Sequence, residues 1–404
     1  MKIISADFIY TPNGFLENLA VAFTDTIRCI DTLEVLEKKY PEAEMITNQP
    51  NSVLFPGFIN THVHLEFSSN RTSLKYGSFM PWLDTVIEHR EDLVGSCDND
   101  IMIRECQAML SSGISTFGAI SSFGNELEVC EKTPQRVVFF NELIGSNAQY
   151  ADMLYNDFLE RIKASEACAK ESKITPAIAI HSPYSVHPVI LQKSVTLAKQ
   201  NKYPLSAHFL ESQAERQWLE NGEGDLKLFF EKYFKTSKPV TTIQEFMYAF
   251  DTYPTHFTHC VQANQVELDY LAQMGHSVAH CPRSNRYLGC GRLAIENLNL
   301  PYSIATDGLS SNDSLNMFDE LRAALLLHND IPIQELASRL LQSVTADAAD
   351  ILGLQCGKIE VDKLADFAII TLPEAPKRVD ELALWSILYT KEVSSLYING
   401  VKEL

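Results

Sequence analysis

A pair of histidines separated by one residue closes an apolar run within residues 56–64. Residues i and i+2 of a β-strand point to the same side, so His62 and His64 are expected to face the same way. Two imidazole nitrogens placed in this manner can chelate one metal ion. Such a pair is weak evidence alone, because it also arises by chance or as a structural pair. The interpretation therefore depends on what else could complete the site.

Two further candidate ligands close apolar runs elsewhere in the chain. His208 ends one of these runs, and Asp307 ends another. Together with His62 and His64 they provide three imidazoles and one carboxylate, which is a suitable donor set for zinc or iron(II). The sequence thus predicts a divalent metal site, with zinc as the first choice and iron(II) as the alternative.

Three other residues could serve catalysis or substrate binding at such a site. Glu211 follows His208 by three residues, where a helix should begin, and could reach a metal-bound water without being a ligand. A solvated glutamate favoured by the helix dipole is the alternative. His259 ends another apolar run and could polarise the substrate, unless it is a satisfied core histidine. His181 ends a further run and is expected to contact the substrate.

These residues need a framework that brings strand ends together. The middle of the chain alternates predicted strands with amphipathic stretches, such as residues 263–274 and 316–328, that favour helices. Eight strands are expected to end near the following residues: His64, Ala119, Leu143, His181, His208, His259, His280 and Asp307. This alternation predicts an α/β fold, a (β/α)8 TIM barrel, in which catalytic groups lie at the C-terminal strand ends.

The two ends of the chain have a different pattern from the middle. Short strands are predicted at residues 3–9, 19–23, 27–30, 364–370 and 395–401, the last with an Asn-Gly turn. A small β-sandwich domain formed from both termini is therefore expected. We expect domain boundaries at residues 1–55 and 356–404 for the two parts of the sandwich and at 56–355 for the barrel.

The composition excludes several classes of partner. The net charge of −19, from 33 basic and 52 acidic residues, argues against binding to nucleic acid or to an anionic membrane. No stretch approaches the length of a transmembrane helix, and no signal peptide is recognised. The nine cysteines are read as reduced thiols of a cytoplasmic protein. A chain of this size is also compatible with a symmetric homodimer.

Taken together, the motifs resemble those of the metal-dependent amidohydrolase superfamily over nearly the whole chain. Residues 56–64 resemble its first-strand motif, and residues 208–211 and 306–308 resemble its fifth- and eighth-strand motifs. The similarity is greatest to the aminohydrolase branch, which deaminates cytosine, guanine and adenosine-like compounds. In that branch a metal-activated water replaces an amino group on a ring, and ammonia leaves.

The resemblance implies further details of the site. Two-metal relatives carry a bridging lysine or glutamate where this chain has residues 181–184, so a single metal ion is implied. Residues 278–285 and 307–312 resemble nucleoside deaminases, which implies a small adenine-type nucleoside as the substrate. Catalytic roles are implied for Glu211, His259 and Asp307, and substrate contacts are implied for Trp82, His181 and Ser311.

Some assignments remain open at this point. Arg286 follows the seventh strand and is expected to pair with a carboxylate of the substrate, unless it is a solvated loop arginine. The ribose hydroxyls could be bound by Glu66, Glu88 or Glu91. The alternatives in function are another deamination, as of adenosine, S-adenosylhomocysteine or guanine, a triazine dechlorination or cyclic-amide opening, and a scaffold without activity.

Overall fold

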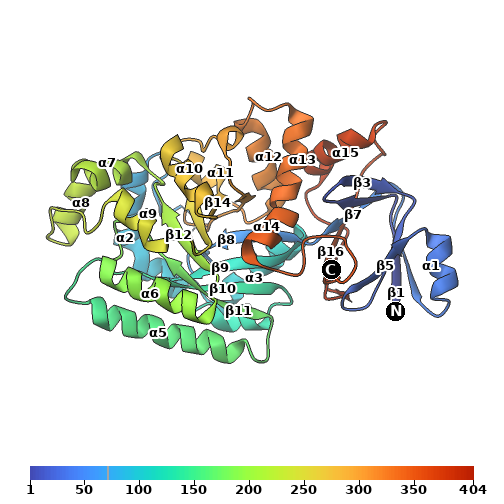
Figure 1. Ribbon diagram of the computed structural model, residues 1–404, viewed down its shortest axis with the longest axis horizontal. Helices are drawn as coiled ribbons and strands as arrows, with labels where there is room; N and C mark the ends of the chain where they lie inside the picture. Colours follow the sequence, from blue (N-terminus) through green and yellow to red (C-terminus); the bar gives the residue numbers. More distant parts are fainter. Residues whose placement is uncertain (71) are drawn as a thin grey trace. The chain divides into compact units, whose positions relative to one another are not determined.

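Eight parallel strands form the largest sheet of the computed structural model, which describes residues 1–70 and 72–404 (Figure 1). In chain order they are β8 (Phe58–Val63), β9 (Ile114–Ser121), β10 (Arg136–Leu143), β11 (Ile174–Ile180), β12 (Leu205–Phe209), β13 (Thr255–His259), β14 (Ser277–His280) and β15 (Tyr302–Ile304). Each strand pairs with the next one along the chain. This order, with helices between the strands, confirms the predicted (β/α)8 fold.

Polar side chains join the first and last strands of this sheet. The Thr61 hydroxyl lies 2.7 Å from that of Ser303, and Nε2 of His256 lies within 3.1 Å of both. Beyond the strand ends, the amide of Asp307 donates to the carbonyl of His62 at 3.1 Å. These contacts close the barrel. Burial lowers the pKa of His256 to about 3, so this imidazole is a neutral core group.

Helices cover the outside of the strands and explain why the strands are so apolar. Every residue of β9 and β10 is buried, as expected for parallel strands that are covered on both faces. The long helix α5 (Ala151–Cys168) packs on β10 and β11, and α6 (Pro188–Asn201) packs on β11 (Figure 1).

The predicted helices begin and end close to the expected residues. The stretch expected at residues 263–274 is α10 (Gln265–Gln273), which begins with a capping box between Asn264 and Glu267. The stretch expected at residues 316–328 is α12 (Met317–Leu327). The other helices are α1 (Leu33–Lys39), α2 (Phe79–Ser96), α3 (Asn99–Ser111), α4 (Leu127–Lys132), α7 (Gln213–Asn221), α8 (Asp225–Tyr233), α9 (Ile243–Phe250), α11 (Pro282–Tyr287), α13 (Ile333–Ser343), α14 (Ala346–Leu352) and α15 (Leu382–Tyr389).

Two smaller sheets are built from the ends of the chain, as predicted. The four-stranded sheet has the order β5 (Ile27–Asp31), β4 (Ala20–Phe23), β1 (Lys2–Ser5) and β6 (Glu44–Thr47). The six-stranded sheet has the order β18 (Val401–Lys402), β17 (Ser395–Ile398), β16 (Phe367–Thr371), β7 (Ser52–Pro56), β2 (Phe8–Thr11) and β3 (Gly14–Glu17). One apolar cluster contains residues of both sheets, including Val21, Phe23, Leu54 and Phe367.

The first predicted strand is two strands in the structure. Residues 3–9 were expected to form one element, but β1 and β2 belong to different sheets, and the chain turns at Ala6 and Asp7. A carboxylate oxygen of Asp7 accepts a hydrogen bond from the amide of Asn51 at 2.6 Å, which stabilises this corner. The strand-like pattern continues through Ala6 and Asp7, so it does not reveal that one strand ends there and another begins.

The C-terminal hairpin has the predicted turn. Ile398 of β17 pairs with Val401 of β18, and only Asn399 and Gly400 lie between them. Both of these residues have positive φ, of 49° and 72°. Such a turn matches the twist of the flanking strands, and an Asn-Gly pair adopts it at little cost.

Contacts divide the chain into two compact units. One contains residues 1–60, 106–117 and 316–404, and the other contains residues 61–105 and 118–315. The domain boundaries given above remain a prediction. All residues of the site described below belong to the second unit.

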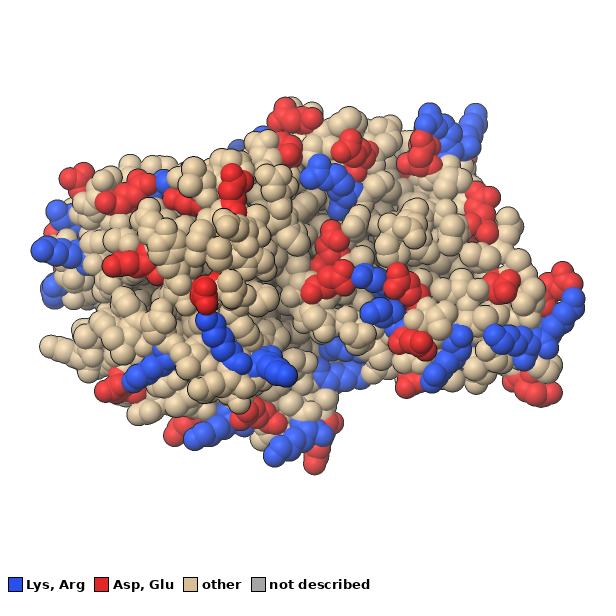
Figure 2. All heavy atoms as spheres, in the orientation of Figure 1, with Lys and Arg blue, Asp and Glu red and all other residues tan. Residues whose placement is uncertain are grey.

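The surface carries charges of both signs. On the face drawn in Figure 2, lysines and arginines are scattered among aspartates and glutamates. None of the helices in the described part of the chain is long and apolar enough to cross a membrane. All nine cysteines lie in that part, and each is a free thiol.

Candidate functional site

Three imidazoles converge at the C-terminal end of the barrel. His62 and His64 come from the end of β8 and His208 from β12, and each offers one ligand atom within 4.8 Å of the others. In the described part of the chain this is the one group of three or more His, Cys, Asp or Glu side chains that satisfies this criterion. The structure therefore brings together the three histidines that the sequence singled out.

Hydrogen bonds fix the orientation of two of these rings. Nδ1 of His208 donates to the carbonyl oxygen of His181 at 2.7 Å, which leaves the lone pair on Nε2. Nδ1 of His62 lies 3.2 Å from the hydroxyl of Thr258, and its Nε2 is directed toward Asp307. A metal-binding imidazole needs such a partner on its other nitrogen to hold its tautomer and ring orientation.

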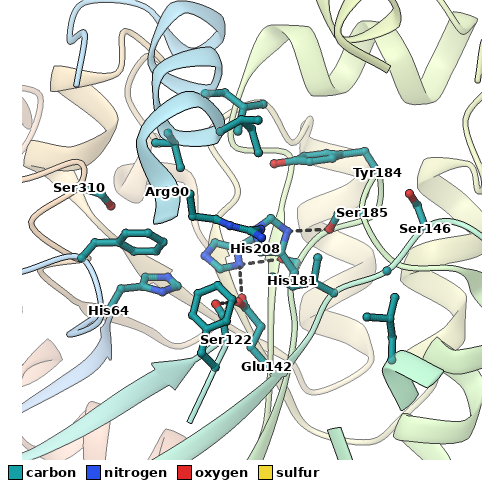
Figure 3. A pocket seen from close by; sticks show the side chains of 18 of the residues that line it. His64, Arg90, Ser122, Glu142, Ser146, His181, Tyr184, Ser185, His208 and Ser310 are labelled. Carbon is teal, nitrogen blue, oxygen red and sulfur yellow. Dashed lines mark hydrogen bonds and ion pairs between the residues drawn. The ribbon is translucent and has the colours of Figure 1, made fainter. Parts of the chain in front are cut away.

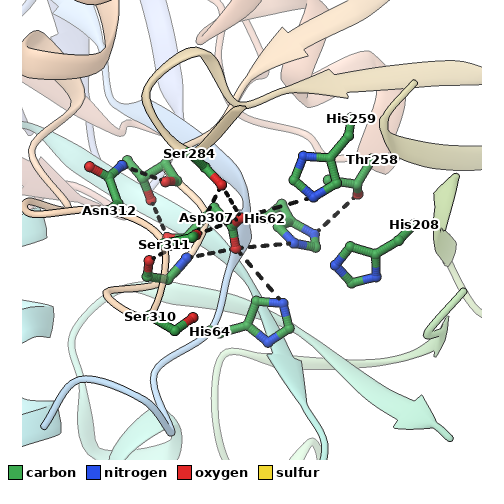
Figure 4. Close-up of polar contacts among 12 residues, drawn as sticks. His62, His64, His208, Thr258, His259, Ser284, Asp307, Ser310, Ser311 and Asn312 are labelled. Carbon is green, nitrogen blue, oxygen red and sulfur yellow. Dashed lines mark hydrogen bonds and ion pairs between the residues drawn. The ribbon is translucent and has the colours of Figure 1, made fainter. Parts of the chain in front are cut away.

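Asp307 completes the group from the loop after β15 (Figure 4). Its Oδ1 atom lies 3.8 Å from Nε2 of His62 and 3.9 Å from Nε2 of His64. Its Oδ2 atom accepts hydrogen bonds from the hydroxyls of Ser284 at 2.8 Å and Ser311 at 2.9 Å. The carboxylate is thus held in place while one oxygen faces the histidines.

The donor set fits a divalent metal ion. Nε2 of His62, which is directed toward Asp307, is buried and has no hydrogen-bond partner. A buried polar atom without a partner is costly, and coordination of a cation would remove that cost. Three imidazoles and one carboxylate are also the ligands typical of zinc sites.

The electrostatics of the site also favour a cation. Burial, followed by the neighbouring imidazoles of His208 and His64, holds the pKa of His62 well below its usual value. Burial and neighbouring imidazoles likewise lower the pKa of His208 to about 3. Burial also acts to lower the pKa of His64, but nearby carboxylates, chiefly that of Glu66, outweigh it and raise this pKa to about 9. The neutral imidazoles of His62 and His208, beside the carboxylate of Asp307, form a site that attracts positive charge.

Glu211 lies beside this group on the loop that follows β12. Its side chain is buried, and its Oε1 atom is 3.7 Å from Nε2 of His259. Burial, followed by the charges of Asp307 and Glu215, raises the pKa of Glu211 well above its usual value. A raised pKa favours the protonated form, in which a carboxyl group can act as a proton donor.

The backbone of the Glu211 loop is held by a second glutamate. The amides of Leu210 and Glu211 donate to the carboxylate of Glu215 at 3.0 and 2.9 Å. Leu210 has a φ of 46°, a left-handed conformation that is unfavourable for a leucine. Glu215 therefore stabilises the turn that directs Glu211 toward the site.

His259 faces the same centre from the end of β13. Its Nδ1 atom lies 2.9 Å from the side-chain oxygen of Asn285, and its Nε2 atom lies 3.9 Å from Oδ2 of Asp307. Both His259 and Asp307 have positive φ, of 73° and 60°. Such conformations are costly and occur together at functional sites, where the surrounding structure maintains them.

A cavity of about 890 Å³ opens over this group, and its lining includes His64, His208, Glu211, His259 and Asp307. The volume lies in the upper part of the range for small-molecule sites, about 300–1,000 Å³. Figure 3 shows His181 and His208 facing this pocket.

Three of the four expected substrate contacts, Trp82, His181 and Ser311, also line the cavity. Trp82 is half-buried and its indole nitrogen donates to the carbonyl of Ser310 at 2.8 Å, which fixes the ring. Nδ1 of His181 lies 2.6 Å from the hydroxyl of Ser185, so its other nitrogen remains for a ligand. Ser311 differs, because its hydroxyl is hydrogen-bonded to Asp307.

Arg286 is not brought to the site. It is exposed on α11 and is absent from the described residues that line the cavity. The arginines in that lining are Arg90 of α2 and Arg161 of α5, and neither was expected from the sequence. Both lie inside helices, so choosing candidates at the ends of strands could not identify them.

Two buried carboxylates near His64 and His208 were not identified from the sequence. Glu142 was missed, and Glu66 was left as one of three candidates. Glu142 lines the cavity from β10, with Oε1 3.8 Å from Nδ1 of His208. Its position one residue before the end of a predicted strand was a signal that could have identified it. Glu66 is buried, 3.7 Å from Nδ1 of His64, whereas the other ribose candidates, Glu88 and Glu91, are exposed on α2.

Comparisons with known proteins agree with this geometry. The model of the amidohydrolase family matches residues 53–402. An aminodeoxyfutalosine deaminase of a Nitratiruptor species is 43% identical over 401 residues, with 99% of this chain and 98% of the relative covered. An adenosine deaminase of Helicobacter pylori is 35% identical over 416 residues, with 99% and 98% covered. The crystal structure of a Helicobacter pylori aminofutalosine deaminase with methylthio-coformycin matches with a TM-score of 0.95 and 33% identity, and both chains are covered completely.

The chain therefore belongs to the amidohydrolase family, and the resemblance seen in the motifs is confirmed. The family is metal-dependent, and the cluster of three histidines fits a metal site. With deaminases as its relatives, the chain is a hydrolase that acts on C–N bonds.

Proposed function

We propose that this protein hydrolytically deaminates an adenine-type nucleoside, 6-amino-6-deoxyfutalosine, on the futalosine route to menaquinone. The observation that carries the proposal is the meeting of Glu211, His259 and Asp307 with three histidines at one end of a nucleoside-sized cavity. The 43% identity with an aminodeoxyfutalosine deaminase supports the choice of substrate. Residues 76–82 and 118–121 also resemble that group of enzymes.

His62, His64, His208 and Asp307 would hold one divalent ion, for which we propose zinc, with iron(II) as the alternative. A single ion is proposed because the end of β11 carries His181 and no bridging carboxylate. When bound, the ion lowers the pKa of a water molecule toward about 7 and so makes it a nucleophile at neutral pH.

The side chains of the site perform the proton transfers. Asp307 orients the attacking water and accepts its proton, a role that suits a carboxylate fixed by two serine hydroxyls. Glu211 donates its proton to the ring nitrogen adjacent to the attacked carbon. It then takes the remaining proton of the added hydroxyl and passes it to the leaving amine, and the proton accepted by Asp307 returns to Glu211 for the next turnover. His259 stabilises the charge that develops near the attacked carbon. The water oxygen remains on the ring as a lactam carbonyl, and ammonia leaves.

The rest of the substrate would lie along the cavity. Trp82, held by its bond to Ser310, offers an aromatic face to the purine or the sugar. His181 is placed to reach the ribosyl part with its free ring nitrogen. Ser311 acts through Asp307 in this proposal, because its hydroxyl is hydrogen-bonded to that carboxylate.

A side-by-side assay of ammonia release tests the proposal. The purified metal-loaded enzyme is given aminodeoxyfutalosine, adenosine, S-adenosylhomocysteine, guanine and cytosine in separate reactions. We expect aminodeoxyfutalosine to have the highest kcat/KM. Preference for any of the other compounds would overturn the substrate and leave the deaminase chemistry in place. Adenosine is the second candidate, because a relative that is 35% identical carries the name adenosine deaminase.

We also propose a cytoplasmic enzyme without nucleic-acid or membrane partners, on the basis of the charge of −19 and the composition. A homodimer is a further proposal from the length of the chain alone. Light scattering on the purified protein would measure its mass in solution and so test that proposal.

A further inference from the structure

Arg90 is a cation at the cavity that the proposed chemistry does not use. It lies on α2, lines the cavity, and points into it in Figure 3. Its guanidinium carbon is 5.4 Å from the centre of the Phe123 ring, and it forms no ion pair with any residue in the described part of the chain. Its side chain is exposed, so its N–H donors remain available to a ligand.

Arg161 differs from Arg90 because its donors are already committed. It donates to the carbonyl of Ser121 at 2.9 Å and to the carbonyl of Glu142 at 2.8 Å. Burial lowers its pKa, while the carboxylate of Glu142 opposes that shift. Arg161 therefore supports the protein around the buried carboxylates, and Arg90 is the arginine placed to bind an external group.

The cavity that Arg90 lines is suited to a flat apolar group. The cavity lining includes aromatic side chains from several elements, namely Phe67, Trp82, Phe123, Tyr184, Phe229, Phe230 and Phe234. An aryl group placed among such rings gains from burial and from edge or stacking contacts. A volume of about 890 Å³ also leaves room beyond a purine and a ribose.

Acidic side chains also line the cavity, so an anionic ligand would depend on Arg90 for its binding. Asp157, Glu160 and Asp307 line it. A carboxylate on the substrate would be repelled by these groups unless a cation received it. Guanidinium groups bind carboxylates through two parallel hydrogen bonds, so one arginine can supply both the charge and the orientation.

We propose that Arg90 is the specificity residue for a carboxylate at the end of an aryl substituent carried by the nucleoside beyond its ribose. The proposal rests on the proposed function, since aminodeoxyfutalosine ends in a benzoate, and it assigns to Arg90 the pairing that the sequence suggested for Arg286. Phe123 stacks on the guanidinium and holds it over the cavity.

Steady-state kinetics of Arg90→Ala and Arg90→Lys test this role. The substrates are aminodeoxyfutalosine, its benzoate methyl ester and adenosine, and Arg104→Ala is the matched control because Arg104 is exposed and absent from the cavity lining. For Arg90→Ala we expect kcat/KM on aminodeoxyfutalosine to fall by about 10–100-fold, mainly through KM, which is typical of a lost hydrogen bond to a charged group. The ester and adenosine should change by less than about twofold, because neither offers a carboxylate. Arg90→Lys should recover part of the loss.

The outcomes separate this inference from the proposed function. An equal fall on all three substrates in Arg90→Ala would overturn the assignment, and so would a change no larger than that of Arg104→Ala. If the wild-type enzyme favours adenosine, the proposed substrate fails. If the wild-type enzyme has equal kcat/KM on aminodeoxyfutalosine and its benzoate methyl ester, the substrate assignment stands. Recognition of the carboxylate by Arg90 is then wrong.

Discussion

The two ends of the cavity are built from different parts of the fold. At the metal-binding end the side chains come from strand ends and the loops that follow them, are buried or nearly so, and have partners that fix their orientation, as Asn285 does for His259. At the other end Arg90 and its aromatic neighbour Phe123 are exposed, and they form a cation–π contact. The barrel therefore fixes the reactive groups, whereas helices and loops provide the surface that selects the substrate.

This difference has consequences for mutation. A change at the metal-binding end removes a group whose position depends on many partners, so its effects should be large and include metal content. A change at the other end should alter the choice of substrate and leave the chemistry intact. The following predictions test that distinction, from the largest expected effect to the smallest.

His208→Ala should abolish both metal binding and activity. The wild-type protein should hold one equivalent of divalent metal per chain, because four donors converge at one point. Removal of one imidazole leaves too few ligands for a tight site. Elemental analysis and ammonia release measure the two effects. Two metal equivalents in the wild type, both required for activity, would contradict the one-metal proposal.

Glu211→Gln should keep its metal and lose turnover by about 10²-fold or more, because it removes proton transfer and no ligand. The amide has nearly the same shape as the carboxyl group, so the loop held by Glu215 should be unchanged. Metal content and kcat are measured on the same preparation. Loss of metal in this variant would make Glu211 a ligand.

The metal-binding end was predictable from the sequence, and the other end was not. Period-2 geometry places His62 and His64 on one side of a strand, and barrel topology then brings His208 and Asp307 to the same rim. Both are rules of backbone geometry, so they can be applied to the spacing of residues in the sequence alone. They also predicted the hairpin at Asn399 and Gly400, where the turn type requires those residues.

The sequence could not indicate which arginine faces the cavity. Arg286 follows a strand and therefore looked suitable, yet it is exposed on α11, while Arg90 lies in the fourth turn of α2 and lines the cavity. The direction of a helix side chain depends on how the helix packs, which the local pattern does not contain. The corner at Asp7 was missed for a similar reason, since only the tertiary arrangement assigns β1 and β2 to different sheets.

Glu215→Gln should reduce the dependence of stability on pH. Burial raises the pKa of Glu215 to about 7, although backbone amides oppose the shift. The folded protein keeps this proton up to about pH 7, whereas the unfolded chain releases it near pH 4, so stability falls as pH rises between the two values, by about 3 kcal/mol. Denaturant unfolding at pH 5 and pH 8 measures the difference. If the free energy of unfolding changes equally between pH 5 and pH 8 in the wild type and the variant, the raised pKa of Glu215 is contradicted.

The smallest effect is expected for Arg286→Ala. The side chain is exposed on α11 and is absent from the described lining of the cavity, so its removal should change kcat/KM by less than about twofold, as is usual for a surface substitution. This variant is compared with Arg90→Ala on aminodeoxyfutalosine and on adenosine, under the same buffer and salt. If specificity lies on α2, only Arg90→Ala changes the ratio of the two efficiencies. A selective loss of aminodeoxyfutalosine activity in Arg286→Ala would show that α11 reaches the ligand during turnover, and would restore the assignment made from the sequence.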